Sequence, residues 1–310
     1  MASASRILVI KLGALGDIVQ VMGPAAAIRA HHRDAAITFL TTAPFAELAR
    51  AAPYFDEVWI DERPGWDDPR GVWRLARRLR EGGFDRVYDF QTRVRTAAYF
   101  WLMRRRGGPE WSGIAPGASH PHANPARTRL HTLDRQADQL RHAGIDRDVP
   151  LPDLSWAPAD LERFGLPPDY MLLIPGGAPH RPRKRWPVGH YAMLARRLAA
   201  AGLTPVAVGG REEKPLGAAI AAAEPKTRDL TGQTGFGDIA ALGRGARRVV
   251  GNDTGPMHLA VAGGAAATVL YSDASNPDLT APRGRDVVVL RRPDLADLPV
   301  DEVAATLALG

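Results

Sequence analysis

Cysteine is absent from this chain of 310 residues. Disulfides, thiolate metal sites and cysteine nucleophiles are therefore excluded. The chain also lacks any apolar run near the ~18 residues needed to span a bilayer. Residues 1–6 lead directly into a short apolar strand, so we expect neither a membrane span nor a signal peptide. These absences predict a cytoplasmic protein.

Lysine is scarce. Only four of the 40 basic residues are lysine, namely Lys11, Lys184, Lys214 and Lys226. Where arginine is the habitual cation, a retained lysine suggests a site that needs a compact point charge and not a planar guanidinium. The first two of these lysines lie in loops that we expect to be functional.

Basic charge is concentrated in the first half. Residues 1–150 carry 22 Lys and Arg against 17 Asp and Glu, a net charge of +5, and residues 70–106 contain 11 arginines against three acidic residues, a net charge of +8. Such a field attracts anionic partners, including a phosphorylated lipid or an anionic membrane surface. A solvated helix face is the alternative. No nucleic-acid-binding module accompanies the patch, so we expect no nucleic acid partner.

Short apolar strands alternate with amphipathic helices along the chain, which predicts two successive doubly wound α/β units. We place their boundary in a segment rich in proline and aspartate, which gives domains of 1–158 and 159–310. The last helix of the chain could pack back on the first domain. Ligands of such folds bind at the carboxyl ends of the strands, and here we expect a cleft between the halves. Strands are predicted at 7–10, 36–40, 57–60, 86–89, 170–174, 204–208, 227–230, 247–250, 267–270 and 287–290; helices at 17–30, 44–52, 70–81, 93–105, 131–143, 188–201, 212–223, 236–242, 254–262 and 300–308; and a long irregular loop at 107–128.

The loop after the first strand is Lys11-Leu12-Gly13-Ala14-Leu15-Gly16-Asp17. It lacks the Gly-x-Gly-x-x-Gly spacing of dinucleotide-binding enzymes, which disfavours a nicotinamide dehydrogenase. Asp17 stands at a helix N-terminus, where a carboxylate can act as a general base on an acceptor hydroxyl. An ordinary helix cap is the alternative reading of the same residue.

Two further loops follow strands of the second half. In 175–187, Gly176 and Gly177 precede four cations, a combination that suits a diphosphate; a solvated basic loop is the alternative. In 251–258, the sequence Gly-Asn-Asp-Thr-Gly-Pro-Met-His reads as a strand, a tight turn and a helix that ends at Gly263-Gly264. The free N–H groups at this helix start favour a phosphate site, although a simple capped helix fits the pattern too.

With these loops, the chain resembles the bacterial lipopolysaccharide heptosyltransferases of glycosyltransferase family nine, which have the two-domain GT-B fold. Five segments in the same order carry the resemblance, and Asp-Thr-Gly-x-x-His is the most specific part of it. They are KLGALGD (11–17), DFQTRVR (89–95), KRWP (184–187), Gly209-Gly210-Arg211-Glu212 with Glu213 beside it, and GNDTGPMH (251–258).

The resemblance implies a role for each matching residue. Asp17 would be the catalytic base of an inverting transfer, and Lys184 would offset charge on the leaving diphosphate. Donor-binding roles fall on Gly176, Gly177, Lys184, Asp253, Thr254, Gly255, Met257 and His258, and acceptor-facing roles on Gly13, Gln91 and Arg95. The implied donor is ADP-L-glycero-β-D-manno-heptose, and the implied acceptor is an anionic lipid-linked core sugar reached by peripheral membrane contact. No Asp-x-Asp pair ends a strand, so we expect no metal and no cofactor.

Several departures leave the donor open. Many relatives have serine where Gly13 stands, and their Gly-x-Thr-x-Pro segment is replaced here by residues 271–277. The same fold using another nucleotide sugar, or a noncatalytic nucleotide-sugar binder, therefore stays as an alternative. The histidines at 120, 122, 131, 142 and 180 are irregularly spaced and are interpreted as surface or loop residues, not as a metal site.

Overall fold

The computed structural model describes residues 5–104, 107–178 and 181–307. The chain divides into two compact units, residues 1–152 and 153–310. The backbone N–H of Leu154 donates to Ala262 O at 2.8 Å, and this bond attaches the start of the second unit to one of its own helices. No helix within the described ranges is both long and apolar enough to cross a membrane.

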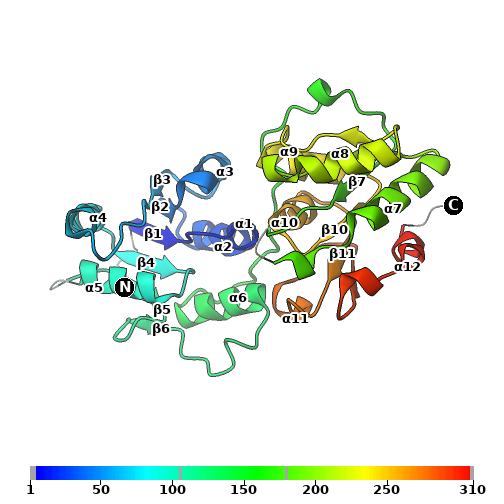
Figure 1. Ribbon diagram of the computed structural model, residues 1–310. Helices are drawn as coiled ribbons and strands as arrows, with labels where there is room; N and C mark the ends of the chain where they lie inside the picture. The colour runs from blue at the N-terminus through cyan, green and yellow to red at the C-terminus, as the bar shows by residue number, and fades with distance from the viewer. Residues whose placement is uncertain (1–4, 105–106, 179–180, 308–310) are drawn as a thin grey trace. The chain divides into compact units, whose positions relative to one another are not determined.

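The first unit is a parallel sheet between helices (Figure 1). Its strands lie in the order β3-β2-β1-β4-β5-β6, with every pairing parallel. The order reverses between β1 and β4, and this switch point is where such sheets bind ligands. The elements are β1 (Arg6–Ile10), α1 (Leu15–Gln20), α2 (Met22–His31), β2 (Ala36–Thr41), a 3₁₀ turn (Ala43–Phe45), α3 (Ala46–Ala51), β3 (Glu57–Ile60), α4 (Pro69–Glu81), β4 (Arg86–Asp89), α5 (Val94–Met103), β5 (Glu110–Gly113), β6 (His120–Pro121) and α6 (Thr132–His142).

The second unit repeats this design. Its sheet has the order β12-β11-β10-β7-β8-β9, again all parallel, with the switch point between β7 and β10. The elements are β7 (Tyr170–Ile174), α7 (Val188–Ala200), β8 (Thr204–Ala207), α8 (Lys214–Ala223), β9 (Arg228–Asp229), α9 (Phe236–Gly245), β10 (Val249–Asn252), α10 (Gly255–Ala262), β11 (Ala267–Tyr271), α11 (Pro277–Thr280), β12 (Val287–Arg291) and α12 (Val300–Ala305), with 3₁₀ turns at Glu162–Phe164, Pro182–Lys184, Arg211–Glu213 and Leu295–Asp297.

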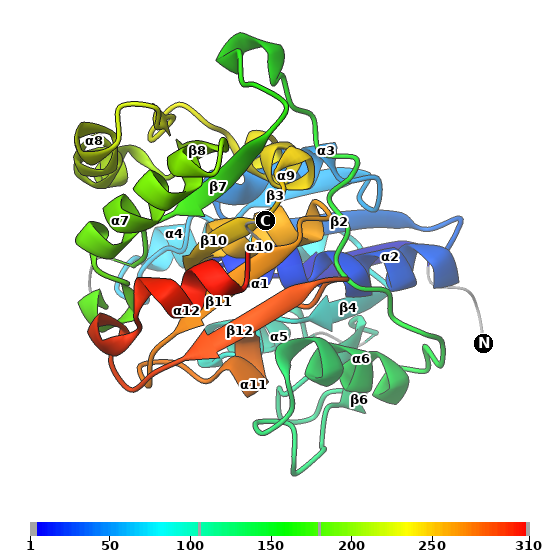
Figure 2. The ribbon, with the colours of Figure 1, turned by 90° about the vertical axis from the view of Figure 1, so that its right-hand side faces the viewer.

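Each unit buries its own core because its central strands are apolar on both faces. In the first unit, side chains of β1 and β4 pack with those of α4 and α5 around Trp111. In the second, β7 and β10 pack with α7 around Trp186. Helix α12 belongs to this second core and lies beside α7 (Figure 2). The two-unit α/β architecture expected from the alternating pattern is therefore confirmed.

Two predicted elements differ from the structure. The helix expected over 17–30 is two helices that meet at Val21. Pro24 has no N–H to donate to Gln20 O, so one regular hydrogen bond is missing at this junction. The segment 107–128, expected to be irregular throughout, contributes β5 and the short edge strand β6 to the sheet. Strands this short give little periodicity to detect in a sequence rich in glycine and proline.

Candidate functional site

The loops predicted to be functional lie at the two switch points. In the first unit, the loop at 11–17 follows β1, and Gln91 follows the adjacent strand β4. In the second unit, the loop at 175–187 follows β7, and residues 253–258 follow the adjacent strand β10. The topology therefore gathers the motifs into two groups, one at the carboxyl edge of each sheet.

Lys11 and Asp17 form the centre of the first group. Lys11 Nζ lies 3.5 Å from Asp17 Oδ1 and donates to Phe90 O at 3.2 Å. The lysine side chain is 6% exposed, whereas that of Asp17 is 39% exposed. Burial lowers the pKa of Lys11, and the charge of Asp17 opposes that shift. Asp17 therefore has a buried cation on one side and solvent on the other.

Gln91 joins the two strands that flank this switch point. Its Oε1 accepts from the backbone N–H of Leu12 at 3.0 Å, which holds the glycine loop against the end of β4. Gly13 has φ +132°, and a Cβ there would lie 2.9 Å from the Phe45 ring. A serine at this position would be strained in the observed backbone.

Asp89, the last residue of β4, is fully buried and was not predicted as a site residue. Its Oδ1 accepts from the N–H groups of Gln91 and Thr92, at 3.0 and 3.1 Å. Among the described residues, its Oδ2 has no hydrogen-bond partner. Burial raises the pKa of Asp89 to about 6, against the hydrogen bonds and the charge of Lys11. The residue shapes the turn that carries Gln91.

Arg95 does not join this group through its hydrogen bonds. Its guanidinium donates to Tyr99 OH at 3.2 Å and to Pro64 O at 3.0 Å, and it stacks over Trp66 at 5.1 Å from the ring centroid. These contacts make Arg95 a support of the segment before α4. Arg135 of α6 interacts electrostatically with Asp17, and sequence reasoning missed this residue.

Lys184 and Asp253 form the centre of the second group. Lys184 Nζ lies 2.5 Å from Asp253 Oδ2, and the two side chains are only 13% and 9% exposed. Burial raises the cost of ionising the carboxyl, but the hydrogen bond and the charge of Lys184 prevail and lower the pKa of Asp253. The pair is therefore a buried ion pair, with its cation from the β7 loop and its anion from the β10 turn.

Asn252 holds these two loops together, and it too was missed as a site residue. The side-chain amide donates to Pro175 O at 2.9 Å and to Gly176 O at 3.0 Å. Its Oδ1 accepts from Trp186 N at 2.9 Å and from Tyr191 OH at 3.2 Å. A fully buried asparagine with all these bonds sets the position of Lys184 relative to Asp253.

Helix α10 begins directly beyond the pair. Thr254 is its N-cap residue with extended backbone, and no side-chain cap bond is made within the described chain. Met257 N donates to Thr254 O at 3.1 Å, and His258 is buried one turn into the helix. The helix ends in a Schellman motif, in which Gly264 N donates to Val261 O and Ala265 N to Ala260 O, and Gly264 has φ +103° as its predicted role at the helix end requires.

The glycines of the β7 loop meet an acidic side chain. A Cβ on Gly176 would lie 2.3 Å from Glu213 Oε1, so a larger residue there would have to displace the Glu213 side chain. The Glu213 carboxylate also accepts from Gly210 N, while Gly177 O accepts from the guanidinium of Arg185. Of two adjacent glutamates in this motif, Glu213 is the one that faces the loop, a choice that sequence alone left open.

The histidine interpretation holds for the loops but not for burial. His122 and His131 lie in loops yet are buried, and His142 is exposed on α6. Moreover, coordinating atoms of His122, Asp138 and His142 lie within 4.8 Å of one another. The irregular spacing conceals this cluster because the chain returns past β6 to α6. His180 lies outside the described residues.

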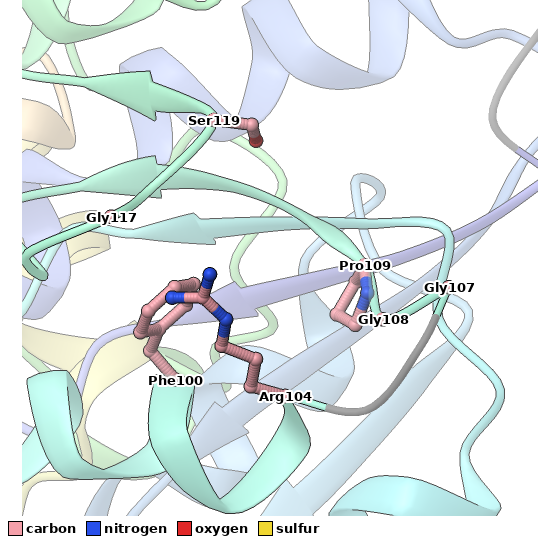
Figure 3. Close-up of a pocket in the computed structure, with 7 residues that line it drawn as sticks. All are labelled: Phe100, Arg104, Gly107, Gly108, Pro109, Gly117 and Ser119. Atoms are coloured by element: carbon pink, nitrogen blue, oxygen red, sulfur yellow. The ribbon is translucent and has the colours of Figure 1, made fainter.

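A pocket of about 260 Å³ lies elsewhere in the first unit (Figure 3). The guanidinium of Arg104 stands over the Phe100 ring, 5.4 Å from its centroid, with Gly117 and Ser119 of the β5–β6 connection across from it. The remaining lining residues are Gly107, Gly108 and Pro109. None of the predicted site residues lines this pocket.

Fold and site define a protein with two doubly wound units, each with a lysine–aspartate pair at its switch point. Residues 72–303 match the family model "Glycosyltransferase family 9 (heptosyltransferase)". The chain therefore belongs to glycosyltransferase family 9. This membership confirms the resemblance drawn from the five motifs.

Curated relatives match over a shorter stretch. The chain is 35% identical to lipopolysaccharide heptosyltransferase 2 of Escherichia coli K12 over 120 residues, which cover 37% of this chain and 34% of that protein. It is 33% identical to lipooligosaccharide heptosyltransferase 2 of Haemophilus influenzae over the same shares. The matched stretch spans about a third of these relatives.

Solved structures match over nearly the full chain. The E. coli ADP-heptose LPS heptosyltransferase II has a TM-score of 0.79 at 24% identity, with 98% of both chains covered. A glycosyltransferase of family 9 from Veillonella parvula has a TM-score of 0.83 at 21% identity, with 97% of this chain and 95% of that chain covered. These likenesses establish the fold.

Proposed function

We propose that the protein is an inverting glycosyltransferase that moves a heptose, or a related sugar, from an ADP-sugar to a lipopolysaccharide-core or similar glycolipid acceptor. Family membership and relatives named as heptosyltransferases support this class of reaction. The observation that carries the proposal is the pair of unlike lysine–aspartate groups, one with an accessible carboxylate and one closed.

Asp17 is the proposed general base. It would accept the proton of an acceptor hydroxyl as that oxygen attacks the anomeric carbon, and the bond to the nucleotide diphosphate would break in the same step. An accessible carboxylate within reach of substrate suits this role. Lys11 and Gln91 hold the loop that carries it.

The donor is proposed to bind at the switch point of the second unit. Lys184 would neutralise charge that develops on the leaving diphosphate, and the start of α10 at Thr254 and Gly255 would provide backbone N–H groups to the same anion. Asp253 would accept hydrogen bonds from sugar hydroxyls. Because lysine and the helix dipole provide the positive charge, the proposed chemistry needs neither a metal nor a cofactor.

Charge around Asp17 supports an anionic acceptor. Arg135 interacts electrostatically with Asp17 and with two further arginines, Arg93 and Arg127. These cations come from α6, from the start of α5 and from the loop between β6 and α6. The arginines grouped around Arg135 favour a phosphorylated substrate, since guanidinium groups bind phosphate in bidentate fashion.

The first unit also presents a surface suited to peripheral membrane contact. Helices α4 and α5 pack together, and they expose Trp73 and Trp101 by 59% and 53%. Exposed arginines flank these rings on α4 at positions 70, 74, 77, 78 and 80. Tryptophan prefers the membrane–water interface, and each basic residue near an anionic leaflet contributes about 1 kcal/mol. We propose that this face meets the cytoplasmic leaflet that holds the acceptor.

A screen of nucleotide sugars by thermal shift tests the donor assignment. A ligand that binds only the native state raises the melting temperature with its occupancy. We expect ADP-heptose to stabilise the protein more than UDP- or GDP-sugars. Stronger stabilisation by a UDP- or GDP-sugar would favour the same fold with another donor, and stabilisation without transfer to any acceptor would favour a noncatalytic binder.

Flotation with lipid vesicles tests the membrane contact. We expect the wild type to float with vesicles that contain anionic lipid and to release at high salt, and the W73A/W101A variant to remain in solution. The matched control is M193A, which removes an exposed apolar side chain (47% exposed) from the second unit. Equal flotation of both variants would rule out the α4–α5 face as the membrane contact.

A further inference from the structure

A histidine–aspartate cluster lies in the first unit, separate from the residues assigned to sugar transfer. Asp138 and His142 are four residues apart in α6, so they stand one turn apart on the same side of the helix. His122 directly follows β6 and approaches from the edge of the sheet, which Figures 1 and 2 show beside α6. Two elements therefore provide three side chains.

The distances within this cluster suit a single bound ion. His122 Nε2 lies 2.8 Å from Asp138 Oδ2, and one potential ligand atom from each of His122, Asp138 and His142 lies within 4.8 Å of the other two. The ring centroids of the two histidines are 5.5 Å apart. Ligands about 2.0–2.2 Å from a metal stand roughly 3–4 Å from one another, so small side-chain rotations would complete the site.

The hydrogen bond of His142 leaves its other nitrogen available for coordination. Nδ1 of His142 lies 2.8 Å from Asp138 O, one helical turn back. A carbonyl can only accept, so Nδ1 carries the proton and the lone pair of the neutral ring is on Nε2. Metal-binding histidines generally have this arrangement, with one nitrogen donating to a carbonyl or carboxylate and the other on the metal.

His122 faces Asp138 with the nitrogen that would bind the ion. Its side chain is fully buried, and Nε2 lies 2.8 Å from Asp138 Oδ2, so an ion between these two atoms would replace the proton that they share. The other ring nitrogen, Nδ1, diverges from Nε2 and has no hydrogen-bond partner within the described part of the chain.

Surrounding groups orient the carboxylate. Asn124 Nδ2 donates to Asp138 Oδ2 at 2.8 Å, and Arg141 pairs with Oδ1 at 3.1 Å. Arg127 is the further cation that faces His122. Against these positive charges stands the C-terminus of α6 at His142, where the helix dipole favours a cation.

We propose that His122, Asp138 and His142 bind one divalent transition-metal ion, with zinc, cobalt or nickel as the chemical class. Two imidazoles and one carboxylate suit these ions, whereas magnesium and calcium prefer all-oxygen ligands. His142 is 39% exposed, which gives the ion an entry path and leaves room for a water ligand. The bound ion fastens the segment after β6 to α6, and its role is structural.

Metal titration of the protein without a histidine tag tests this site. We expect one equivalent of Co²⁺ to produce visible d–d absorption that Zn²⁺ abolishes, and Zn²⁺ to raise the melting temperature. The chain has no cysteine, so thiolate bands cannot confuse the spectrum. H142A alters an exposed side chain that should not affect folding, and it should weaken Co²⁺ binding at least tenfold, as should H122Q.

The matched control is H31A, which removes an exposed histidine of α2 in the same unit. H31A should bind Co²⁺ like the wild type. The proposal is overturned if the wild type takes up no stoichiometric metal at micromolar concentration, or if H142A binds as tightly as H31A. Because the readout is metal binding, failure here leaves the glycosyltransferase proposal intact.

Discussion

The two units of this protein share one strand order but use their lysine–aspartate pairs in different ways. In the first, Lys11 is buried while Asp17 is 39% exposed, with 3.5 Å between the charged atoms. In the second, Lys184 and Asp253 are both largely buried and lie 2.5 Å apart. The open pair leaves a carboxylate available for reaction, and the closed pair keeps both charges in a set position. One topology therefore holds the same pair of charges in two different arrangements.

A second contrast concerns two buried aspartates at the ends of strands. Burial raises the pKa of Asp89 to about 6, because Lys11 offsets only part of the cost. The pKa of Asp253 is lowered instead, since Lys184 more than compensates for burial. The position of the nearest cation, and not burial alone, decides the direction of the shift.

The largest expected effect comes from the open pair. D17N keeps the size of the side chain but cannot accept a proton, so we expect the transfer rate to fall by about 10²–10⁴. Donor affinity, measured by calorimetry, should stay within twofold. A variant that retains transfer would show that the accessible carboxylate is not the base.

Breaking the closed Lys184–Asp253 pair should weaken donor binding. K184M removes the cation proposed to face the diphosphate, and a hydrogen bond to a charged group is worth about 1.5–3 kcal/mol, or roughly 10–150-fold in affinity. Titration with ADP and with ADP-heptose measures this loss. The control is K214M, which removes a lysine from the start of α8 in the same unit. Equal affinities for the two variants would contradict the donor assignment.

The lysines of the two pairs, Lys184 and Lys11, should differ in their effect on folding. K184M leaves Asp253 buried without its partner, and we expect the free energy of unfolding to fall by about 3 kcal/mol. K11M replaces a buried cation with an apolar chain and leaves Asp17 accessible to water, so the change should be under about 1 kcal/mol. Urea denaturation of both variants measures the difference, and similar losses would refute this contrast.

Stability should depend on pH in opposite ways at the two buried aspartates. The folded pKa of Asp89, about 6, lies above its ordinary value of 3.8. The folded state therefore binds the proton more tightly, and stability declines as pH rises from about 4 to 6. We expect the wild type to lose about 2 kcal/mol relative to D89N over this range, measured by urea denaturation at each pH.

Asp253 should show the reverse dependence. Its folded pKa is lowered, so the stability it provides is present above its unfolded pKa and is lost as pH falls through the folded value. D253N should remove this part of the acid sensitivity. If wild type and D253N lose stability in parallel below pH 4, the Lys184–Asp253 pair does not contribute in this way.

Much of the fold could be predicted because it depends on local pattern. The central strands β1, β7 and β10 are continuous apolar runs, and the loops that follow them contain the glycines and charges of the site. Residues whose role depends on distant contacts were missed. Arg135 of α6 interacts electrostatically with Asp17, which lies in the loop after β1. Asn252 bonds to Trp186 and Pro175 of the β7 loop, which lie 66 and 77 positions earlier in the sequence.

The sequence by itself determined the two α/β units, the family and the loops that carry Asp17, Lys184 and Asp253, because strand periodicity and short motifs are properties of neighbouring residues. Only the tertiary structure decided which aspartate of the two pairs is open to solvent, that Glu213 and not its neighbour faces Gly176, and that His122 meets α6. These outcomes depend on burial and on distances between segments far apart in the chain, and parallel strands bring such segments together without leaving a local signal.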